Sequence, residues 1–281
     1  MDTSLNLQSA FRAANFDPKS LEEPGAWVGH IPFANWLILE TRPDVFVELG
    51  THTGNSYFSF CQTINDYALR TKAFSVDTWQ GDSHAGFYSE SVFEYVKETN
   101  KGYQSFSTLL RKTFDDASEM FSDNSIDLLH IDGLHTYQAV SHDFTTWLPK
   151  MSDKGIVILH DTNVFRDDFG VHKLFRELEQ KYDSMNFLHS HGLGVLRVGK
   201  NSPDIIPKTT DGQLVFQQFF EALGNRLVSR LAFETQINAL NSKNIQLQSS
   251  VQQATDTIDE INQSLSWKVT APIRRLGKIF S

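Results

Sequence analysis

The stretch that decides the fold is Val45-Phe46-Val47-Glu48-Leu49-Gly50-Thr51-His52-Thr53-Gly54-Asn55-Ser56. Its first half is a short apolar, β-branched run, which predicts a buried strand. Glu48 lies near the end of that strand, two glycines bracket a tight turn, and an amphipathic helical run follows. A strand, a glycine turn and a helix in this order form the ligand-binding corner of a doubly wound α/β fold. Glycines allow the backbone there to approach a bound nucleoside.

The spacing in this stretch is Glu-x-Gly-x-x-x-Gly, whereas dinucleotide-binding proteins have Gly-x-Gly-x-x-Gly. The observed spacing resembles motif I of the class I S-adenosylmethionine (SAM) methyltransferases. This resemblance implies that SAM lies over the turn, with Glu48 near its methionine end. The turn residues that we expect to contact the cofactor are Gly50, Thr51, Thr53, Gly54 and Ser56. A glycine turn that merely connects two elements is the alternative interpretation.

Composition limits the class of protein. The chain has 281 residues, 40% of them hydrophobic, which suits one α/β domain with an appendage. A net charge of −9 argues against a protein that coats nucleic acid. The single cysteine, Cys61, excludes an intramolecular disulfide and fits a reducing compartment. Residues 1–10 lack the features of a signal peptide, and no run is apolar enough to span a bilayer, so we expect a cytoplasmic protein.

Strands and helices alternate from residue 44 to about residue 182. Further strands are predicted over 72–77, 106–112, 126–132 and 155–161, and a hairpin over 186–190 and 195–198, with Gly192-Leu193-Gly194 as its turn. Alternation of this kind requires a mostly parallel sheet. The sequence therefore predicts a doubly wound, seven-stranded, Rossmann-like sheet.

Acids end four of these predicted strands: Glu48, Asp77, Asp132 and Asp161. In open α/β sheets the ligand crevice lies outside the carboxyl ends of the strands, so we expect these acids at one edge. Asp77 has the position of an acid that accepts the ribose hydroxyls of a nucleoside, although a turn cap is an equal alternative. Further residues expected beside the cofactor are Thr78, Trp79, Thr113, Phe114 and Asp132.

Asp132 and Asp161 end strands that are neighbours in the usual doubly wound order, so they are expected to converge on the catalytic site. Carboxylates at this spacing suit Mg²⁺, Ca²⁺ or Mn²⁺. His160 is a tentative further metal ligand, although strand alternation directs it away from Asp161. A sugar hydroxyl is barely ionised at neutral pH and needs a base or a metal. His135, three residues after Asp132, is the predicted catalytic base.

Longer motifs make the resemblance more specific. They are Asp77-Thr78-Trp79-Gln80-Gly81-Asp82, Ile126-Asp127-Leu128-Leu129-His130-Ile131-Asp132-Gly133-Leu134-His135-Thr136-Tyr137, His160-Asp161-Thr162-Asn163 and His189-Ser190-His191-Gly192-Leu193-Gly194. Together they resemble the methyltransferase-24 type of SAM-dependent methyltransferases, over about residues 44–199. Members of that group accompany glycosyltransferases in surface-polysaccharide assembly. The resemblance implies a SAM-dependent O-methyltransferase with a sugar or glycan acceptor and a glycosyltransferase partner.

The same resemblance bears on metal binding. Related macrolide-sugar and catechol O-methyltransferases hold Mg²⁺ with acids at these two strand ends, which correspond to Asp132 and Asp161. Those relatives place a further acid or Asn beside the second aspartate. This chain has His160 and Thr162 there instead, so the resemblance leaves metal dependence open.

Five segments are predicted: an N-terminal helical or lid segment (1–43), the methyltransferase domain (44–200), a linker (201–212), a helical coiled-coil segment (213–265) and a basic, apolar tail (266–281). The coiled-coil seam has alternating three- and four-residue steps, with Asn244 at an a position. It predicts a homo-oligomer, dimer or trimer, unless the helix folds back on its own domain. The tail predicts either peripheral contact with the inner face of the membrane or docking onto a protein.

Two other function classes stay open. A nicotinamide-dependent oxidoreductase would use the same sheet, but the glycine spacing argues against it. A non-catalytic coiled-coil scaffold of a glycan-assembly complex would not need to bind SAM.

Overall fold

The computed structural model describes residues 6–23 and 25–277. The chain divides into two compact units, Met1–Ser229 and Arg230–Ser281. In the described part of the chain, no helix combines the length and the apolar content that crossing a bilayer requires. The predictions for the first five residues and for Lys278, Ile279 and Phe280 of the tail lie outside the described residues, as do the side chains of Arg275 and Leu276.

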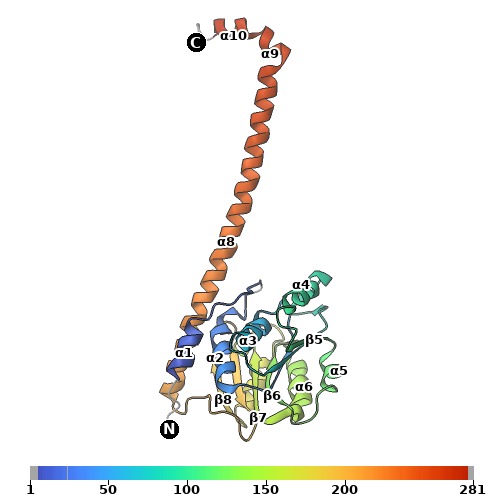
Figure 1. Cartoon of the computed structure of the whole chain (residues 1–281), viewed down its shortest axis with the longest axis vertical. Coiled ribbons are helices and arrows are strands. Elements are labelled where there is room, and N and C mark those ends of the chain that lie inside the picture. The colour runs from blue at the N-terminus through green and yellow to red at the C-terminus, as the bar shows by residue number, and fades with distance from the viewer. Residues whose placement is uncertain (1–5, 24, 278–281) are drawn as a thin grey trace. The chain divides into compact units, whose positions relative to one another are not determined.

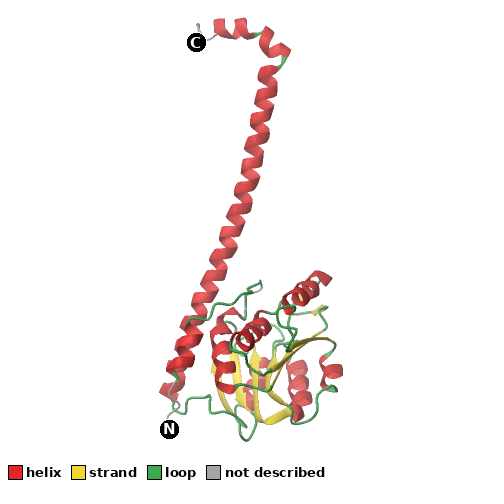
Figure 2. Cartoon of the chain, viewed as in Figure 1, coloured by secondary structure: helices red, strands yellow, loops and turns green. Residues whose placement is uncertain are grey.

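A seven-stranded sheet forms the centre of the first unit (Figure 2), in the order β5-β2-β1-β6-β7-β9-β8. The strands are β1 (Val45–Leu49), β2 (Lys72–Asp77), β5 (Ser107–Arg111), β6 (Ile126–Ile131), β7 (Met151–His160), β8 (Asp183–Phe187) and β9 (Leu193–Arg197). Neighbours from β5 to β7 are parallel, while β9 and β8 form an antiparallel edge. The predicted doubly wound, mostly parallel sheet is therefore confirmed.

Helices cover both faces of this sheet (Figure 1), with α2 and α3 on one side and α6 on the other. The helical elements of this unit are α1 (Leu7–Ala14), η1 (Val28–His30), α2 (Ile31–Thr41), α3 (Asn55–Asp66), α4 (Glu90–Asn100), α5 (Phe114–Ser118), α6 (Tyr137–Trp147), η2 (Leu148–Lys150) and α7 (Val171–Leu178). Alternation along β1 decides which side chain meets which layer. Phe46 packs on Phe60 of α3, with ring centroids 4.5 Å apart, while Val47 and Leu49 join the core on the α6 side.

The turn of the β8–β9 hairpin differs from the prediction. Leu193 and Gly194 lie in β9, so only Gly192, with φ 91°, belongs to the turn of the hairpin. Gly194 is needed for packing instead, because a Cβ there would lie 2.3 Å from the ring of Phe175 in α7. In addition, the loop over residues 78–88 contains a short two-stranded sheet of β3 (Gly81–Asp82) and β4 (Gly86–Phe87).

The long helix α8 (Thr210–Gln263) begins in the first unit. Its first turns are apolar and pack on α2, where Phe220 is fully buried against Phe33 and Trp36. The second unit contains the rest of α8, followed by α9 (Leu265–Val269) and α10 (Ala271–Gly277). Leu265, predicted as the last seam position, therefore lies beyond the end of α8.

The packing of α8 on α2 generates a stability prediction. Phe220→Ala removes a fully buried ring and should lower the free energy of unfolding of the first unit by about 3–5 kcal/mol. Val215→Ala, at a side chain that is 66% exposed, should change it by no more than about 0.5 kcal/mol. Urea unfolding followed by circular dichroism measures both values, and equal effects would show that the start of α8 is not part of this core.

Candidate active site

A cavity of about 590 Å³ opens at the carboxyl ends of β1, β2, β6 and β7. This volume lies within the range of small-molecule sites. Residues from all four strand ends line the cavity, together with the N-terminal segment and the loop over residues 78–88. The predicted cofactor contacts that line it are Gly50, Thr51, Thr53, Ser56, Asp77, Thr78, Thr113, Phe114 and Asp132.

The turn after β1 can be made only by glycine at its first position. Gly50 has φ 85°, and a Cβ on it would lie 2.1 Å from the carbonyl oxygen of Asp132. The amide of Asp132 in turn donates to the carbonyl of Leu49, with N and O 2.8 Å apart. The glycine turn and the end of β6 are therefore in direct backbone contact.

Asp77 supports the same turn from the side of β2. Its Oδ2 accepts hydrogen bonds from the amides of Thr51 (2.8 Å) and His52 (3.0 Å), and its Oδ1 accepts one from the amide of Trp79 (2.7 Å). The side chain is thus a turn cap, and it also lines the cavity. A carboxylate has acceptor positions beyond these three, so the cap does not remove it from ligand binding.

Glu48 is the first of three predicted cofactor contacts that do not line the cavity. Alternation along β1 turns it toward the α3 side, where it is fully buried and its Oε2 lies 2.8 Å from Nδ1 of His130. Nε2 of His130 accepts the indole N–H of Trp27 at 3.1 Å, so His130 must donate through Nδ1. Burial raises the pKa of Glu48, which the bond from His130 partly offsets. Since Trp27 lines the cavity, Glu48 contributes indirectly by holding this wall.

Gly54 and Trp79 are the other two predicted cofactor contacts that do not line the cavity. Gly54 has φ 87° and caps the start of α3, where a Cβ would lie 2.6 Å from the ring of Phe58. Trp79 is 1% exposed, and its indole N–H donates to the carbonyl of His52 at 3.0 Å. Both residues therefore support the backbone around the cavity without lining it.

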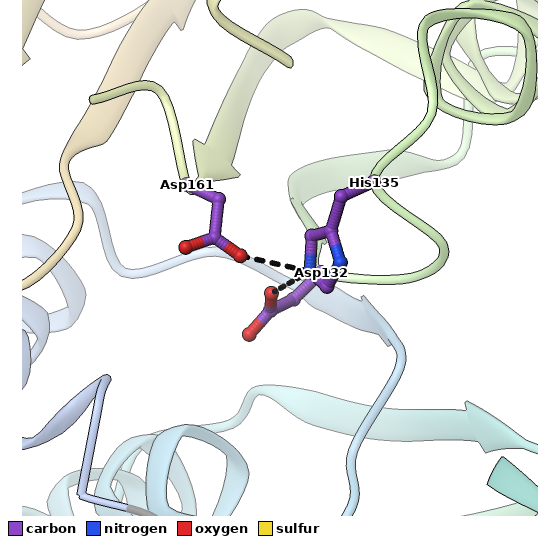
Figure 3. A group of neighbouring side chains, drawn as sticks. All are labelled: Asp132, His135 and Asp161. Atoms are coloured by element: carbon purple, nitrogen blue, oxygen red, sulfur yellow. Dashed lines mark ion pairs between the residues drawn. The ribbon is translucent and has the colours of Figure 1, made fainter. Parts of the chain in front are cut away.

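Asp132, His135 and Asp161 meet at the other end of the cavity (Figure 3). Nε2 of His135 lies 2.8 Å from Asp161 Oδ2 and 3.5 Å from Asp132 Oδ1. One ligand atom from each of the three residues lies within 4.8 Å of the others. The two strand-end aspartates that we expected to converge are therefore joined by the imidazole between them.

His160 also faces this cluster, contrary to the prediction that it points away from Asp161. Its Nδ1 lies 3.2 Å from Asp132 Oδ1 and 3.6 Å from Asp161 Oδ2. The reason is the backbone of Asp161, whose left-handed φ of 62° ends the regular pleat of β7. Neighbouring side chains that would alternate in a strand can then share one site. Nε2 of His160 is 3.1 Å from the carbonyl of Ser190.

The charge state of His135 bears on its predicted role as base, which stays a prediction. Burial alone would lower its pKa, but the hydrogen bonds and charges of Asp132 and Asp161 outweigh burial and raise the pKa to about 10. The same carboxylates raise the pKa of His160 to about 9, again against burial. A histidine that is already protonated at neutral pH cannot accept the proton of a substrate. In this state His135 is a donor that holds the two carboxylates together.

The sequence did not single out several residues of the cavity wall, among them Trp27, His52, Asp82 and Tyr88. His52 lies inside the quoted glycine turn, Asp82 and Tyr88 belong to a loop rich in aromatic and polar groups, and Trp27 lies in the N-terminal segment. His84 from the same loop pairs with Asp168 at 2.7 Å. The ring of Phe169 lies parallel to those of His84 and His135, with centroids 4.6 and 4.8 Å away.

Comparison with known proteins agrees with this geometry. Residues 47–162 match the family model of a methyltransferase domain, of the methyltransferase-24 type. The predicted resemblance is thereby confirmed over these residues. A protein of Sinorhizobium fredii, y4gI, described as uncharacterized, is 49% identical over 185 residues, which cover 66% of this chain and 20% of that protein. The chain thus spans about a fifth of the length of this curated relative.

Solved structures of low sequence identity are also similar. SAH-bound methyltransferase PaMTH1 of Podospora anserina is 12% identical, with a TM-score of 0.46, over 68% of this chain and 86% of that one. The O-methyltransferase TomG of Streptomyces achromogenes, which is involved in tomaymycin synthesis and was solved with SAM, is 12% identical, with a TM-score of 0.47, over 71% and 92%. Similarity at this level carries no argument about cofactor or substrate.

The charge on His135 generates a pH prediction for the metal-free protein. Its folded pKa of about 10 lies above the ordinary 6.5, so its stabilisation is complete below pH 6.5 and is lost as the pH rises through 10. Over that window His135 should lower the free energy of unfolding by up to about 1.4 kcal/mol per pH unit, and His160 adds a fall of its own up to about pH 9. His135→Gln should flatten the fall.

His142→Gln is the matched control, because Nε2 of His142 also lies 2.8 Å from a carboxylate, Asp115, but at an exposed site. Exposed pairs contribute little, so this variant should keep the wild-type slope. Urea unfolding between pH 6 and 10 in EDTA measures all three proteins. A His135→Gln slope equal to that of wild type would contradict the assigned charge.

Proposed function

We propose that the chain is a SAM-dependent O-methyltransferase that acts on a sugar hydroxyl. The observation that carries the proposal is that one cavity joins two half-sites. A glycine turn braced by Asp77 lies at one end, and the cluster of Asp132, His135 and Asp161 lies at the other. The first suits a nucleoside-bearing donor, and the second suits a polar acceptor. The match of residues 47–162 to a methyltransferase domain supports the same reaction class.

The residues of the first half-site fit the donor. Gly50 keeps side chains away from the turn, and Thr51 is fixed there by its hydroxyl, 2.6 Å from that of Ser75. Asp77 offers carboxylate acceptors to hydroxyl groups, while Trp27 and Tyr88 supply apolar wall. The sulfonium of bound SAM supplies the methyl group. The chain's own contribution is to align donor and acceptor in the cavity and to exclude water.

Asp132 is the residue best placed to orient the acceptor hydroxyl. Its Oδ1 faces His160 and His135, and among the described residues none forms a hydrogen bond with its Oδ2. Its side chain is 20% exposed, against 7% for Asp161. As the new C–O bond forms, the hydroxyl oxygen becomes positive and its proton becomes acidic, so a carboxylate is a sufficient base. We assign that proton to Asp132, with His135 and His160 stabilising the carboxylates.

A divalent cation fits the same cluster. Asp132, His135 and Asp161 would hold it, with His135 in place of the predicted His160, and His135 would have to lose its proton to bind the cation. Two carboxylates and one imidazole favour Mn²⁺ or another transition metal over Mg²⁺ or Ca²⁺, which prefer oxygen ligands. A bound cation lowers the pKa of a coordinated hydroxyl. Metal assistance is therefore a proposal that activity measured with and without EDTA and Mn²⁺ tests.

The biological setting follows from the resemblance to enzymes of surface-polysaccharide assembly. We propose a glycan of the cell surface as acceptor and a glycosyltransferase as partner. Peripheral membrane contact through the tail stays a prediction. In its described part Val269 and Ile273 are 74% and 70% exposed, and the guanidinium of Arg274 lies 3.7 Å from the ring centroid of Trp267. A basic, apolar surface with a Trp suits the interface of a membrane.

Cofactor binding is the first test. Isothermal titration should show binding of SAM and none of NAD. Asp77→Asn replaces an acceptor of three backbone N–H groups by an amide, and should weaken SAM binding at least tenfold. Asp123→Asn, in an exposed pair with Lys150, should leave it unchanged. Binding of NAD but not SAM would favour the oxidoreductase, and binding of neither would favour the scaffold.

Methyl transfer is the second test. Asp161→Asn keeps a residue that tolerates φ 62° but removes one carboxylate beside His135. We expect SAM affinity within about twofold of wild type and methyl transfer reduced on the order of 100-fold, since this side chain touches the acceptor half-site only. Mass spectrometry of the surface glycan from cells with either form measures the outcome. A glycan with unchanged O-methyl content would overturn the proposed function.

A further inference from the structure

The second unit exposes a long apolar stripe on α8. Seven large apolar side chains between Phe233 and Ile261 are each 48–65% exposed: Phe233, Ile237, Leu240, Leu247, Val251, Ile258 and Ile261. Side chains of this kind are normally covered, and a contiguous stripe of them marks an interaction surface. No described part of the chain covers them.

The spacing of these residues defines the geometry of the missing partner. They fall in a heptad repeat with a positions at Ile237, Asn244, Val251 and Ile258. The d positions are Phe233, Leu240, Leu247, Ala254 and Ile261. A seam of this kind keeps facing a second helix of the same repeat over its full length. A globular partner would not require the repeat to persist for four heptads.

The side chains at a and d select the number of strands. Every a position except Asn244 is β-branched, and two of the d positions are Leu. β-branched residues at a with Leu at d favour two strands over three or four. The sequence pattern alone left dimer and trimer open, whereas the bounds of α8 remove Leu265, a γ-branched a position, from the seam.

Asn244 selects the relative direction of the two helices. In a parallel pair in register, the two Asn244 side chains lie opposite each other and can hydrogen-bond amide to amide. In an antiparallel pair, each a position lies beside a d position, and all d positions here are apolar. The amide would then be buried without a partner, which is unfavourable.

Area and charge both permit a second copy of the same helix. At about 60–120 Å² for each aliphatic side chain, the seven residues would bury on the order of 600 Å² per helix. A stable interface buries about 800 Å² per partner in total. Over α8 from Glu234 to the end, the flanking e and g positions carry only two charges, Glu234 and Lys243, so identical helices do not repel.

From these observations we propose that residues 233–261 pair with a second copy of this chain as a parallel, in-register, two-stranded coiled coil. The proposal concerns the second unit alone and does not depend on the proposed enzymatic function.

The first experiment measures the mass of the full chain by light scattering after size exclusion. Wild type should be a dimer, and Leu240→Glu combined with Leu247→Glu should be a monomer. The control adds the same two charges at outward c positions, Gln246→Glu with Gln253→Glu, and should remain a dimer. Unfolding of the first unit should be unchanged in both variants, which separates loss of pairing from loss of folding. A wild-type monomer or trimer would overturn the proposal.

The second experiment tests direction and register. Cys61 is fully buried, so a new cysteine is the only accessible thiol. Leu240→Cys, at a d position away from the middle of the seam, places two thiols opposite each other in the proposed pair, and mild oxidation should convert most of the chain to a disulfide-linked dimer. Ser242→Cys, at an outward f position, should give little cross-linking. An antiparallel pair would hold the two copies of residue 240 more than ten residues apart along the helices and leave Leu240→Cys uncross-linked as well, and that result would also refute the proposal.

Discussion

Parallel strands that end at one edge of a sheet bring their terminal residues together, and this constraint organises the first unit. Asp77 is the last residue of β2, Asp132 and Asp161 directly follow β6 and β7, and all three line one cavity. Carboxylates gathered in this way repel one another and lose hydration. The protein compensates with donors: backbone amides on Asp77, and imidazoles between Asp132 and Asp161. Each half of the cavity therefore supplies its own hydrogen-bond donors to its carboxylates.

The histidines do more in this arrangement than supply a base. His135 and His160 hold their protons because two carboxylates face them, and in turn the pKa values of Asp132 and Asp161 lie below their ordinary range, although burial opposes this. Two carboxylates and two imidazolium groups leave the cluster close to neutral, and in the proposed function these fixed charges face the place where the donor would bring a sulfonium and the acceptor a hydroxyl. An arrangement of fixed charges that needs no reorganisation during the reaction is how active sites stabilise a transition state.

Much of this architecture is predictable from the sequence, because strand period and terminal acids are local features. β1, β2, β6 and β7 and the acids after them follow from short runs of residues. The placement of Glu48 does not, since only the packing of β1 against α3 shows that this acid faces Trp27 and His130. The orientation of His160 depends on a single left-handed residue, Asp161, which no periodicity reveals. The role of Gly194 required the position of a helix distant in sequence.

The contact between Gly50 and the carbonyl of Asp132 has a thermodynamic consequence. In the proposed function, the turn that would receive the donor and the residue that would receive the acceptor share a close-packed backbone junction, so a shift of one displaces the other. Occupancy of one half-site is then linked to affinity at the other. By reciprocity, the donor changes the affinity for the acceptor by the same factor by which the acceptor changes the affinity for the donor. The spent donor, which has lost its methyl group and its positive charge, would contribute a different factor.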